Sequence, residues 1–420
     1  MAGTAKVGRA AKGRRWLVRG ALAGAVALLA AISIQDTAAQ VAARTNLQLA
    51  HMLDPGAGRI AGRLAERTFA AEMQAAPDSR AAKLALQALR NDPTAVEAAA
   101  TLALLAQLRG DQSRSDALFA YANTLSQREL RPQLWAIEQA VTRGDVEGAL
   151  RHYDIALTTS RGAEDLLFPV LEKALREPLV RRTLLEKLAS QPVWTRGFVN
   201  YAAITVSDPA ATIDFFRSGQ SAGLPIQEAE RTAIVNAVAA RGQHNLAWSY
   251  YSSFRPQALR THSRDAEFMG TQDNPAVFDW VLRYDTGAIA SLQGGEEGGL
   301  LDFSAPPGSS GALVDQLQIL PAGQYRLEGR SAGIDLADDE RPYWLVTCAS
   351  GRELARIPVP NSDVNGGRFS GTVRVPAGCP VQTLSLIVRS SNRIAGASGQ
   401  FEFVRLVPST GSTSSAVGRS

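Results

Sequence analysis

Helix-breaking residues recur along the first half of this chain at one fixed interval. Gly110 and Gly144 lie 34 residues apart, Pro178 follows 34 residues later, and the Ala76-Pro77 break precedes Gly110 by 34. Between the breaks, from residue 40 to about 255, alanine and leucine recur at the spacing of one helix face. This period predicts repeated helix pairs, which bury their apolar faces by stacking on one another.

Three units of this period, 62–95, 96–129 and 130–163, carry similar side chains at matching positions. Small residues stand where helices cross closely, and aromatic residues stand where successive pairs leave a gap. We expect the packing positions to include Gly110, Phe119, Gly144, Ala149, Tyr153 and Ala156. On these residues the chain resembles the tetratricopeptide repeat (TPR) family. The resemblance implies an α-solenoid that binds a protein partner through its helical repeats.

The resemblance is close over residues 62–163 and loose as far as residue 254. The early aromatic residue of the first helix is absent, and the second and third units lack the closing proline. Helix pairs near 164–190, 195–218 and 225–254 keep the spacing but few of the characteristic residues. An α-solenoid of unspecified family is therefore the alternative for residues 40–255.

The sequence changes character after Arg260. Gly, Pro, Ser and β-branched residues become more frequent, and alternation of apolar and polar residues replaces the helical period. The predicted strands are Ala276–Tyr284, Leu300–Ser304, Leu313–Leu320, Gln324–Gly329, Tyr343–Cys348, Glu353–Val359, Gly367–Val375, Thr383–Val388 and Gln400–Val407. Short strands separated by turns predict an antiparallel β-sandwich or jelly roll over residues 276–408. We expect a linker at 256–275 and a disordered Ser/Thr/Gly-rich tail at 409–420.

A basic segment and then an apolar one open the chain. Residues 1–19 contain six Lys or Arg and no acid, and the apolar segment 20–36 begins with fifteen uncharged residues. This order favours a cytoplasmic N-terminus and export of the rest of the chain. Residues 16–36 together approach the length of a membrane span, which predicts an uncleaved anchor. The alternative is a signal peptide cleaved near Thr37-Ala38-Ala39.

The expected location is therefore a bacterial inner membrane, with a single-pass anchor and the bulk of the chain in the periplasm. A soluble periplasmic protein, released by signal cleavage, is the alternative. The chain is rich in arginine and poor in lysine, with five lysines among 44 basic residues. Together with the hydrophobic export segment, this composition fits a GC-rich Gram-negative bacterium. Removing the six basic residues of the N-terminal segment leaves 38 basic and 40 acidic residues, a net charge of −2. This near-neutral balance argues against a nucleic-acid partner.

The chain contains two cysteines, Cys348 and Cys379, both close to predicted strands. An even number of cysteines in an exported chain favours a disulfide. Two reduced, buried thiols are the alternative. Two cysteines are too few for a structural zinc site and the four histidines are scattered, so neither a metal nor a cofactor is expected.

Adjacent aromatic residues mark a candidate ligand site in the β region. Tyr343 and Trp344 are neighbours in one predicted strand, so they face opposite sides of the sheet. One of them would be exposed near Arg341 and Asp339. An exposed ring beside a guanidinium and a carboxylate can stack on a sugar and hydrogen-bond it. In this respect the domain looks like carbohydrate-binding jelly rolls, and a polysaccharide is the expected ligand.

These features predict a non-enzymatic, exported envelope scaffold without catalytic residues. The solenoid would bind a protein partner, and the sandwich would bind saccharide or stabilise the assembly, in exopolysaccharide or cell-surface glycan assembly. One alternative is a polysaccharide hydrolase or lyase, which needs two converging carboxylates. Its candidates are Asp335, Asp338, Asp339 and Glu340. The other alternative is a purely structural sandwich that caps the last helix pair of a protein-binding solenoid.

Overall fold

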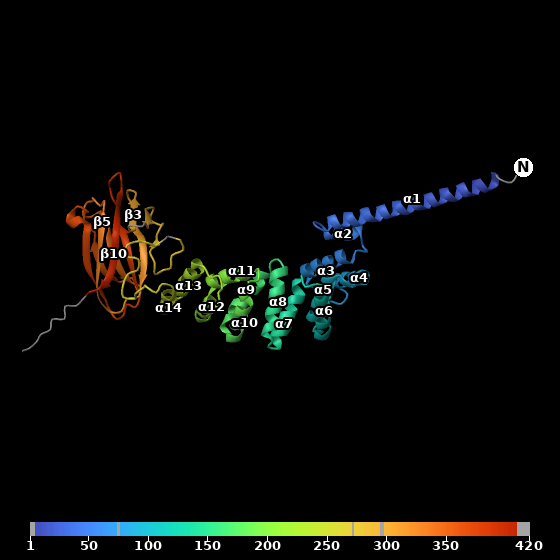
Figure 1. The fold of residues 1–420 in the computed structure, drawn as a ribbon, viewed down its shortest axis with the longest axis horizontal. Helices are drawn as coiled ribbons and strands as arrows, with labels where there is room; N and C mark the ends of the chain where they lie inside the picture. The colour runs from blue at the N-terminus through green and yellow to red at the C-terminus, as the bar shows by residue number, and fades with distance from the viewer. Residues whose placement is uncertain (1–4, 74–75, 271–272, 295–297, 410–420) are drawn as a thin grey trace, which may run out of the picture. The chain divides into compact units, whose positions relative to one another are not determined.

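A helical region precedes a β-sandwich along the chain (Figure 1). The computed structural model describes residues 5–73, 76–270, 273–294 and 298–409, with the backbone alone for 5–15, 17 and 18. The chain divides into two compact units. The first unit comprises residues 1–169 and 182–194, and the second comprises 170–181 and 195–420. The predicted fold class, helical repeats followed by two antiparallel sheets, is confirmed.

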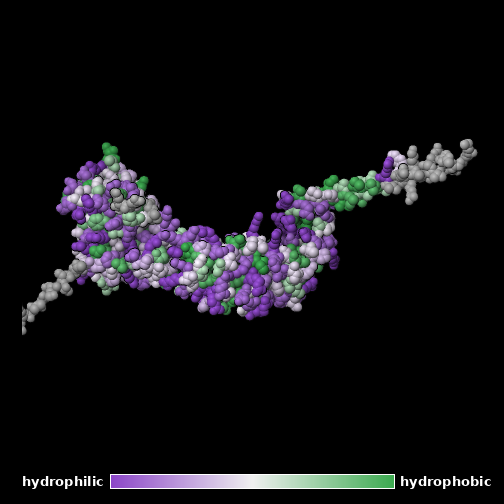
Figure 2. All heavy atoms as spheres, in the orientation of Figure 1, coloured by the Kyte–Doolittle hydropathy of each residue, from purple (hydrophilic) through white to green (hydrophobic). Residues whose placement is uncertain are grey.

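The first helix, α1 (Ala5–Ala42), is long and apolar enough to cross a membrane. Within its stretch Arg19–Ala42, a window of 18 residues has a mean hydropathy of 1.6, and Figure 2 shows hydrophobic residues along it. The predicted apolar segment 20–36 lies within α1, and the helix continues past Ala39, where cleavage was the alternative. Helix α2 (Leu47–Leu53) follows after a turn.

Helix pairs follow at the predicted spacing. The first three pairs are α3 (Gly58–Glu72) with α4 (Arg80–Asn91), α5 (Val96–Leu108) with α6 (Gln112–Leu125), and α7 (Leu130–Thr142) with α8 (Val146–Thr159). The later helices are α9 (Ala163–Lys173) with the short turn η1 (Ala174–Arg176), α10 (Pro178–Ala189), α11 (Thr195–Thr205), α12 (Pro209–Ser221), α13 (Glu228–Ala240) and α14 (His244–Phe254).

The repeated Gly-Asp pair explains how two of these helix pairs turn. Gly110 and Gly144 have φ angles of 79° and 70°, a left-handed conformation that glycine adopts without a steric penalty. Asp111 and Asp145 then begin the following helices. Each carboxylate accepts a hydrogen bond from the backbone N–H three residues later, at 3.2 and 2.8 Å. The sequence pair therefore ends one helix and starts the next.

Ten strands form the C-terminal domain in the residues that the structure describes. They are β1 (Val281–Leu282), β2 (Ile289–Gln293), β3 (Leu300–Ala305), β4 (Gly311–Gln318), β5 (Gly323–Ala332), β6 (Tyr343–Cys348), β7 (Glu353–Pro358), β8 (Arg368–Val375), β9 (Gln382–Val388) and β10 (Ala397–Pro408), with the short turn η2 (Val364–Gly367) before β8. One sheet has the order β1-β4-β9-β6-β7 and the other β2-β3-β10-β5-β8. All of these pairings are antiparallel.

Two strand predictions were wrong. Strand β2 was not predicted, and of the strand predicted at 276–284 only Val281–Leu282 forms a strand, β1, which pairs with β4. Residues 276–280 instead turn before the strand, where the Asp279 carboxylate accepts a hydrogen bond from the N–H of Ala276 at 3.0 Å. Side-chain hydrogen bonding of this kind competes with strand pairing.

The segment expected as a linker, 256–275, packs against the sandwich in the residues described. The N–H of Ser263 donates to the carbonyl of Leu406 at 3.0 Å, and the N–H of Val404 donates to the carbonyl of Ala266 at 2.8 Å. Phe268 is fully buried in the sandwich core. The segment therefore belongs to the β-domain. Of the predicted tail 409–420, all but residue 409 lies outside the described residues.

Candidate functional site

Tyr343 is the half-buried first residue of β6, in the sheet β1-β4-β9-β6-β7. Two arginines pack against its ring. The guanidinium of Arg356, on β7, lies 4.5 Å from the ring centroid, and that of Arg389, directly after β9, lies 4.9 Å from it. Since β7 and β9 flank β6, the two cations reach the ring from neighbouring strands on either side. Cation–π contacts of this length fix both the ring and the cations.

The two arginines differ in how their charge is balanced. Arg356 forms an ion pair with Glu353 at 2.8 Å, and this partner raises the pKa of Arg356 and lowers that of Glu353. Arg389 donates instead to the backbone carbonyls of Asp338 and Asp339, at 3.5 and 3.3 Å. Carbonyl oxygens carry only partial charge, so the Arg389 guanidinium keeps the capacity to bind an anionic or strongly polar ligand group.

Trp344 is not available to a ligand. Its side chain is wholly buried, and it packs against Trp280 and Phe401 at centroid distances of 5.7 and 5.4 Å. The prediction that Trp344 forms part of the ligand site was wrong. Strand alternation correctly required one ring to face outward, but that ring belongs to Tyr343.

The acidic loop before β6 is joined to the loop after β9. Arg341 pairs with Asp338, and Arg393 pairs with Asp335 at 3.9 Å. The nearly buried carboxylate of Glu340 accepts a hydrogen bond from the N–H of Asn392 at 2.8 Å. Arg341 therefore pairs within the acidic loop, and Asp339 contacts Arg389 through its backbone carbonyl, whereas the contacts of Asp335 and Glu340 join the two loops.

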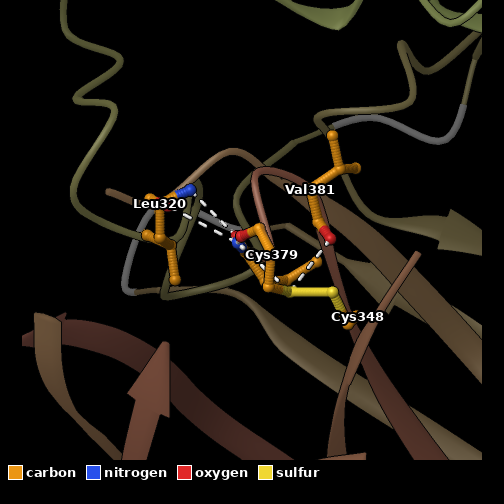
Figure 3. The surroundings of a disulfide bond; sticks show 5 residues. Leu320, Cys348, Cys379 and Val381 are labelled. Carbon is orange, nitrogen blue, oxygen red and sulfur yellow. Dashed lines mark hydrogen bonds between the residues drawn. A yellow bond between two sulfur atoms is a disulfide. The ribbon is translucent and has the colours of Figure 1, made fainter. Parts of the chain in front are cut away.

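The two cysteines form a disulfide, with their Cα atoms 5.7 Å apart. Figure 3 shows its surroundings: Cys348 ends β6, and Cys379 lies in the turn before β9. The buried side chain of Gln382 donates to the carbonyl of Cys379 and accepts from the N–H of Leu320 at 2.9 Å. The disulfide therefore joins the end of β6 to the turn between β8 and β9.

In the helical region, the predicted packing residues lie in the interior or at the turns. Gly110 and Gly144 form turns, whereas Phe119, Ala149, Tyr153 and Ala156 are buried. The Phe119 ring, on α6, stacks on that of Trp135, on α7, with centroids 6.0 Å apart. An aromatic pair thus joins one helix pair to the next. Burial raises the pKa of the Tyr153 phenol.

An arginine that the sequence patterns did not reveal holds the β-domain to the segment before it. Arg264 is nearly fully buried, and its Nε donates to the carbonyl of Phe278 at 2.9 Å while Nη1 donates to Gln318 Oε1 at 2.6 Å. Gln316 exchanges two hydrogen bonds with the Arg264 backbone, at 3.0 and 2.9 Å. Burial lowers the pKa of Arg264 to about 10, which leaves it charged at neutral pH.

The same region binds the last helix pair to the sandwich. Phe278 is fully buried against Trp248 and Tyr251 of α14, at centroid distances of 5.2 and 5.3 Å. The Tyr251 hydroxyl donates to Asp279 at 2.5 Å, and burial raises the pKa of the Tyr251 phenol. The Asn236 side chain, on α13, donates to the carbonyl of Pro275 at 3.0 Å and accepts from the N–H of Val277 at 2.7 Å.

These junction residues carried one weak signal in the sequence. Gln316 and Gln318 occupy alternate positions of a predicted strand, on the side where Val314 is also buried. Polar side chains on the inward face of a strand must find buried partners. The partner, Arg264, lies more than 50 residues away in the sequence, so local patterns could not identify it.

Among the described residues, no three His, Cys, Asp or Glu side chains gather closely enough to hold a metal ion. No protein-family model matches the chain, and no curated protein matches it.

Solved structures with low similarity were found. The enzymatically active domain of tailspike protein 4 from bacteriophage CBA120 has 12% identity and a TM-score of 0.24, over 33% of this chain and 21% of that one. The CBM22-1 xylan-binding domain of Paenibacillus barcinonensis Xyn10C has 11% identity and a TM-score of 0.24, over 36% and 94%. PilW, a type IV pilus biogenesis factor, has 17% identity and a TM-score of 0.26, over 47% and 92%.

This chain therefore spans about a fifth of the length of the phage protein. At such low identities and TM-scores, these likenesses support no statement about what the chain binds.

Proposed function

We propose that this chain is a membrane-anchored, non-enzymatic envelope scaffold, with TPR-like helical repeats that bind a protein partner and a β-sandwich that closes the end of the repeats. The observation that carries the proposal is the buried junction of α13 and α14 with the β-domain. A helical repeat array needs a cap where its last pair would otherwise expose an apolar face. Apolar contact there comes from the rings of Phe278, Trp248 and Tyr251. The side chains of Arg264 and Asn236 form hydrogen bonds with backbone groups beside these rings.

The partner-binding role rests on the helical repeats of the first unit. Their small residues face inward, while larger apolar side chains such as Leu108, Tyr121 and Val141 remain exposed on α5, α6 and α7. Stacked helix pairs of this kind present an extended surface on which repeat proteins bind their partners. The partner would be another component of the cell envelope, in the assembly of surface glycan.

An uncleaved anchor is favoured over a cleaved signal by the packing of α1. Ala39 and Ala43 are buried in one cluster with Leu47 and Ala50 of α2 and with Ile60 and Leu64 of α3. Cleavage after Ala39 would remove part of this core from the folded chain. The mature protein isolated from membranes should therefore have the intact mass of a chain that retains residues 20–39. A mass that begins at residue 40 would show that the segment is a cleaved signal.

Saccharide binding is the second candidate role of the sandwich, and the specific observation in its favour is the Tyr343 surface. The Tyr343 ring holds the Arg389 guanidinium in place, and the donors of that guanidinium are suited to sugar hydroxyls or a uronic-acid carboxylate. The acidic loop does not favour a hydrolase, since Asp335 and Asp338 form ion pairs and Glu340 caps a backbone N–H.

The full chain in detergent, applied to an array of neutral and acidic oligosaccharides, tests this role. Tyr343→Ala should abolish binding, whereas Tyr284→Ala should not, because Tyr284 is an exposed tyrosine elsewhere in the β-domain. Equal loss in both variants, or no binding by the wild type, would leave the sandwich with the capping role alone. Release of new reducing ends during the assay would favour the hydrolase.

Hydrogen exchange tests the capping role. Phe278→Ala should reduce amide protection in α13 and α14 together with the adjoining β-domain, because the ring is buried between them. Tyr284→Ala is again the matched control. Unchanged protection in both helices would contradict the proposed cap.

A further inference from the structure

Helix α2 is apolar on two faces, and the described part of the chain covers only one of them. Leu47 and Ala50 are buried against α1 and α3. On another face Leu49, Met52 and Leu53, spaced i, i+3 and i+4, are exposed. In a helix of seven residues this leaves Gln48 and His51 as the only polar side chains. A short helix with an uncovered apolar face normally meets another apolar phase.

The position of α2 along α1 indicates that this apolar phase is the membrane. The N–H of Asn46 donates to the carbonyl of Ala42 at 2.7 Å, and the side-chain amide of Gln35 donates to the carbonyl of Leu53 at 2.6 Å. Contacts at both ends of α2 show that it runs back antiparallel beside α1. Its last residue, Leu53, therefore lies level with Gln35.

Gln35 directly follows the uncharged run that ends at Ile34. At 1.5 Å per residue, the stretch from Trp16 to Ile34 is about 28 Å long, close to the ~30 Å hydrocarbon core of a bilayer. The end of the run thus marks the edge of the hydrocarbon, and the C-terminal end of α2 reaches the same level.

We propose that the C-terminal end of α2, with Met52 and Leu53, inserts into the membrane–water interface beside the anchor helix, where it contacts lipid. This inference rests on the proposed membrane anchor. Burial of Ala39 and Ala43 between α1, α2 and α3 connects the inserted end to the first helix pair. The first repeats are then held at the bilayer surface by two points of contact.

Site-directed spin labelling of the full chain tests this placement. The two native cysteines are joined in a disulfide, so one introduced cysteine can be labelled selectively. Three single variants, Met52→Cys, Leu28→Cys and Leu108→Cys, replace side chains that are 70%, 64% and 57% exposed. Each labelled protein is reconstituted into phosphatidylethanolamine–phosphatidylglycerol vesicles. The accessibility of each label to oxygen is compared with its accessibility to a water-soluble nickel chelate.

The expected ratio of oxygen to nickel accessibility is highest at Leu28, intermediate at Met52 and lowest at Leu108, with Met52 several-fold above Leu108. If Leu28 reports lipid while Met52 matches Leu108, the α2 inference is wrong and the anchor stands. If Leu28 itself reports water, the membrane anchor fails, and the α2 inference fails with it.

Discussion

The helical repeats and the sandwich are stabilised by cores of opposite character. Around α3, α4 and α5 the buried cluster contains seven alanines, among them Ala65, Ala85 and Ala98, and two leucines. The sandwich core instead contains Trp280, Phe303, Trp344, Phe369 and Phe401. Small side chains let helix backbones approach closely, so stability is spread over many weak contacts. Aromatic side chains concentrate buried apolar area in a few positions.

This difference determines which substitutions each region tolerates. In the sandwich, removal of one ring leaves a large cavity, because its neighbours cannot close around it. In the repeats, removal of a methyl group leaves little space, whereas an added side chain has nowhere to go. The comparison therefore predicts that truncation damages the sandwich and enlargement damages the repeats.

The largest expected effect is that of Trp344→Ala. The loss of a fully buried indole should destabilise the sandwich by about 3–5 kcal/mol. Hydrogen exchange measured by mass spectrometry on the full chain should show lost protection over residues 300–408 and unchanged protection over 58–159. Tyr343→Ala, at the adjacent but half-buried position, should have a much smaller effect. Equal effects of the two variants would contradict the assignment of Trp344 to the core.

Removal of the disulfide should have the next largest effect, and again only in the sandwich. The bond closes a loop with a sequence separation of 31, so its loss should cost about 3 kcal/mol, mainly because the unfolded chain gains freedom. In the double variant Cys348→Ser, Cys379→Ser, hydrogen exchange should show lost amide protection over residues 300–408 at a lower denaturant concentration than in the wild type. A parallel decrease in the amide protection of α3–α8 would show that the disulfide stabilises the helical repeats as well as the sandwich.

The parts of this fold that local patterns determine could be predicted from the sequence. Strand β6 was predicted with its observed bounds, because its alternating side chains are independent of the partner strands. The helix pairs were predicted from their period, because Gly110 and Gly144 end helices through their own backbone conformations.

Features that depend on distant partners could not be predicted. Alternation showed that Tyr343 and Trp344 face opposite sides, but which side is the core depends on the second sheet. The segment 256–275 was expected to be a linker, whereas Arg264 finds buried partners on β4, more than 50 residues away. The sequence therefore placed the two rings on opposite sides of the strand but could not show which of them is exposed.

Enlargement of the alanine core is the corresponding test in the repeats. Ala85 is fully buried on α4, so Ala85→Leu should destabilise the first helix pairs by about 1–3 kcal/mol through overpacking. Leu86→Ala, at the next and exposed position, should change stability little. Thermal unfolding of both variants followed by helical circular dichroism gives the comparison. If Ala85→Leu left the stability unchanged, the core around Ala85 would contain a cavity large enough for the leucine side chain.

The smallest expected effect concerns a carboxylic acid between the repeats. Burial, followed by the nearby negative charge of Glu66 and then Glu97, raises the pKa of Glu129 from 4.5 to about 7, while Arg131 opposes the shift. Between these two values the folded chain binds more protons than the unfolded chain, so this group makes stability fall as the pH rises from 4.5 to 7.

Glu129→Gln replaces this acid with a side chain that stays neutral. Because Glu129 is only partly buried, solvent screening reduces the effect, and we expect a gain of about 1 kcal/mol above pH 7 and none at pH 4.5 or below. Unfolding midpoints of the wild type and the variant at pH 4.5 and pH 8 measure the difference. The exposed Glu138→Gln is the control and should show no such pH dependence. A gain of equal size at both pH values would mean that the amide stabilises the repeat by contacts unrelated to proton binding.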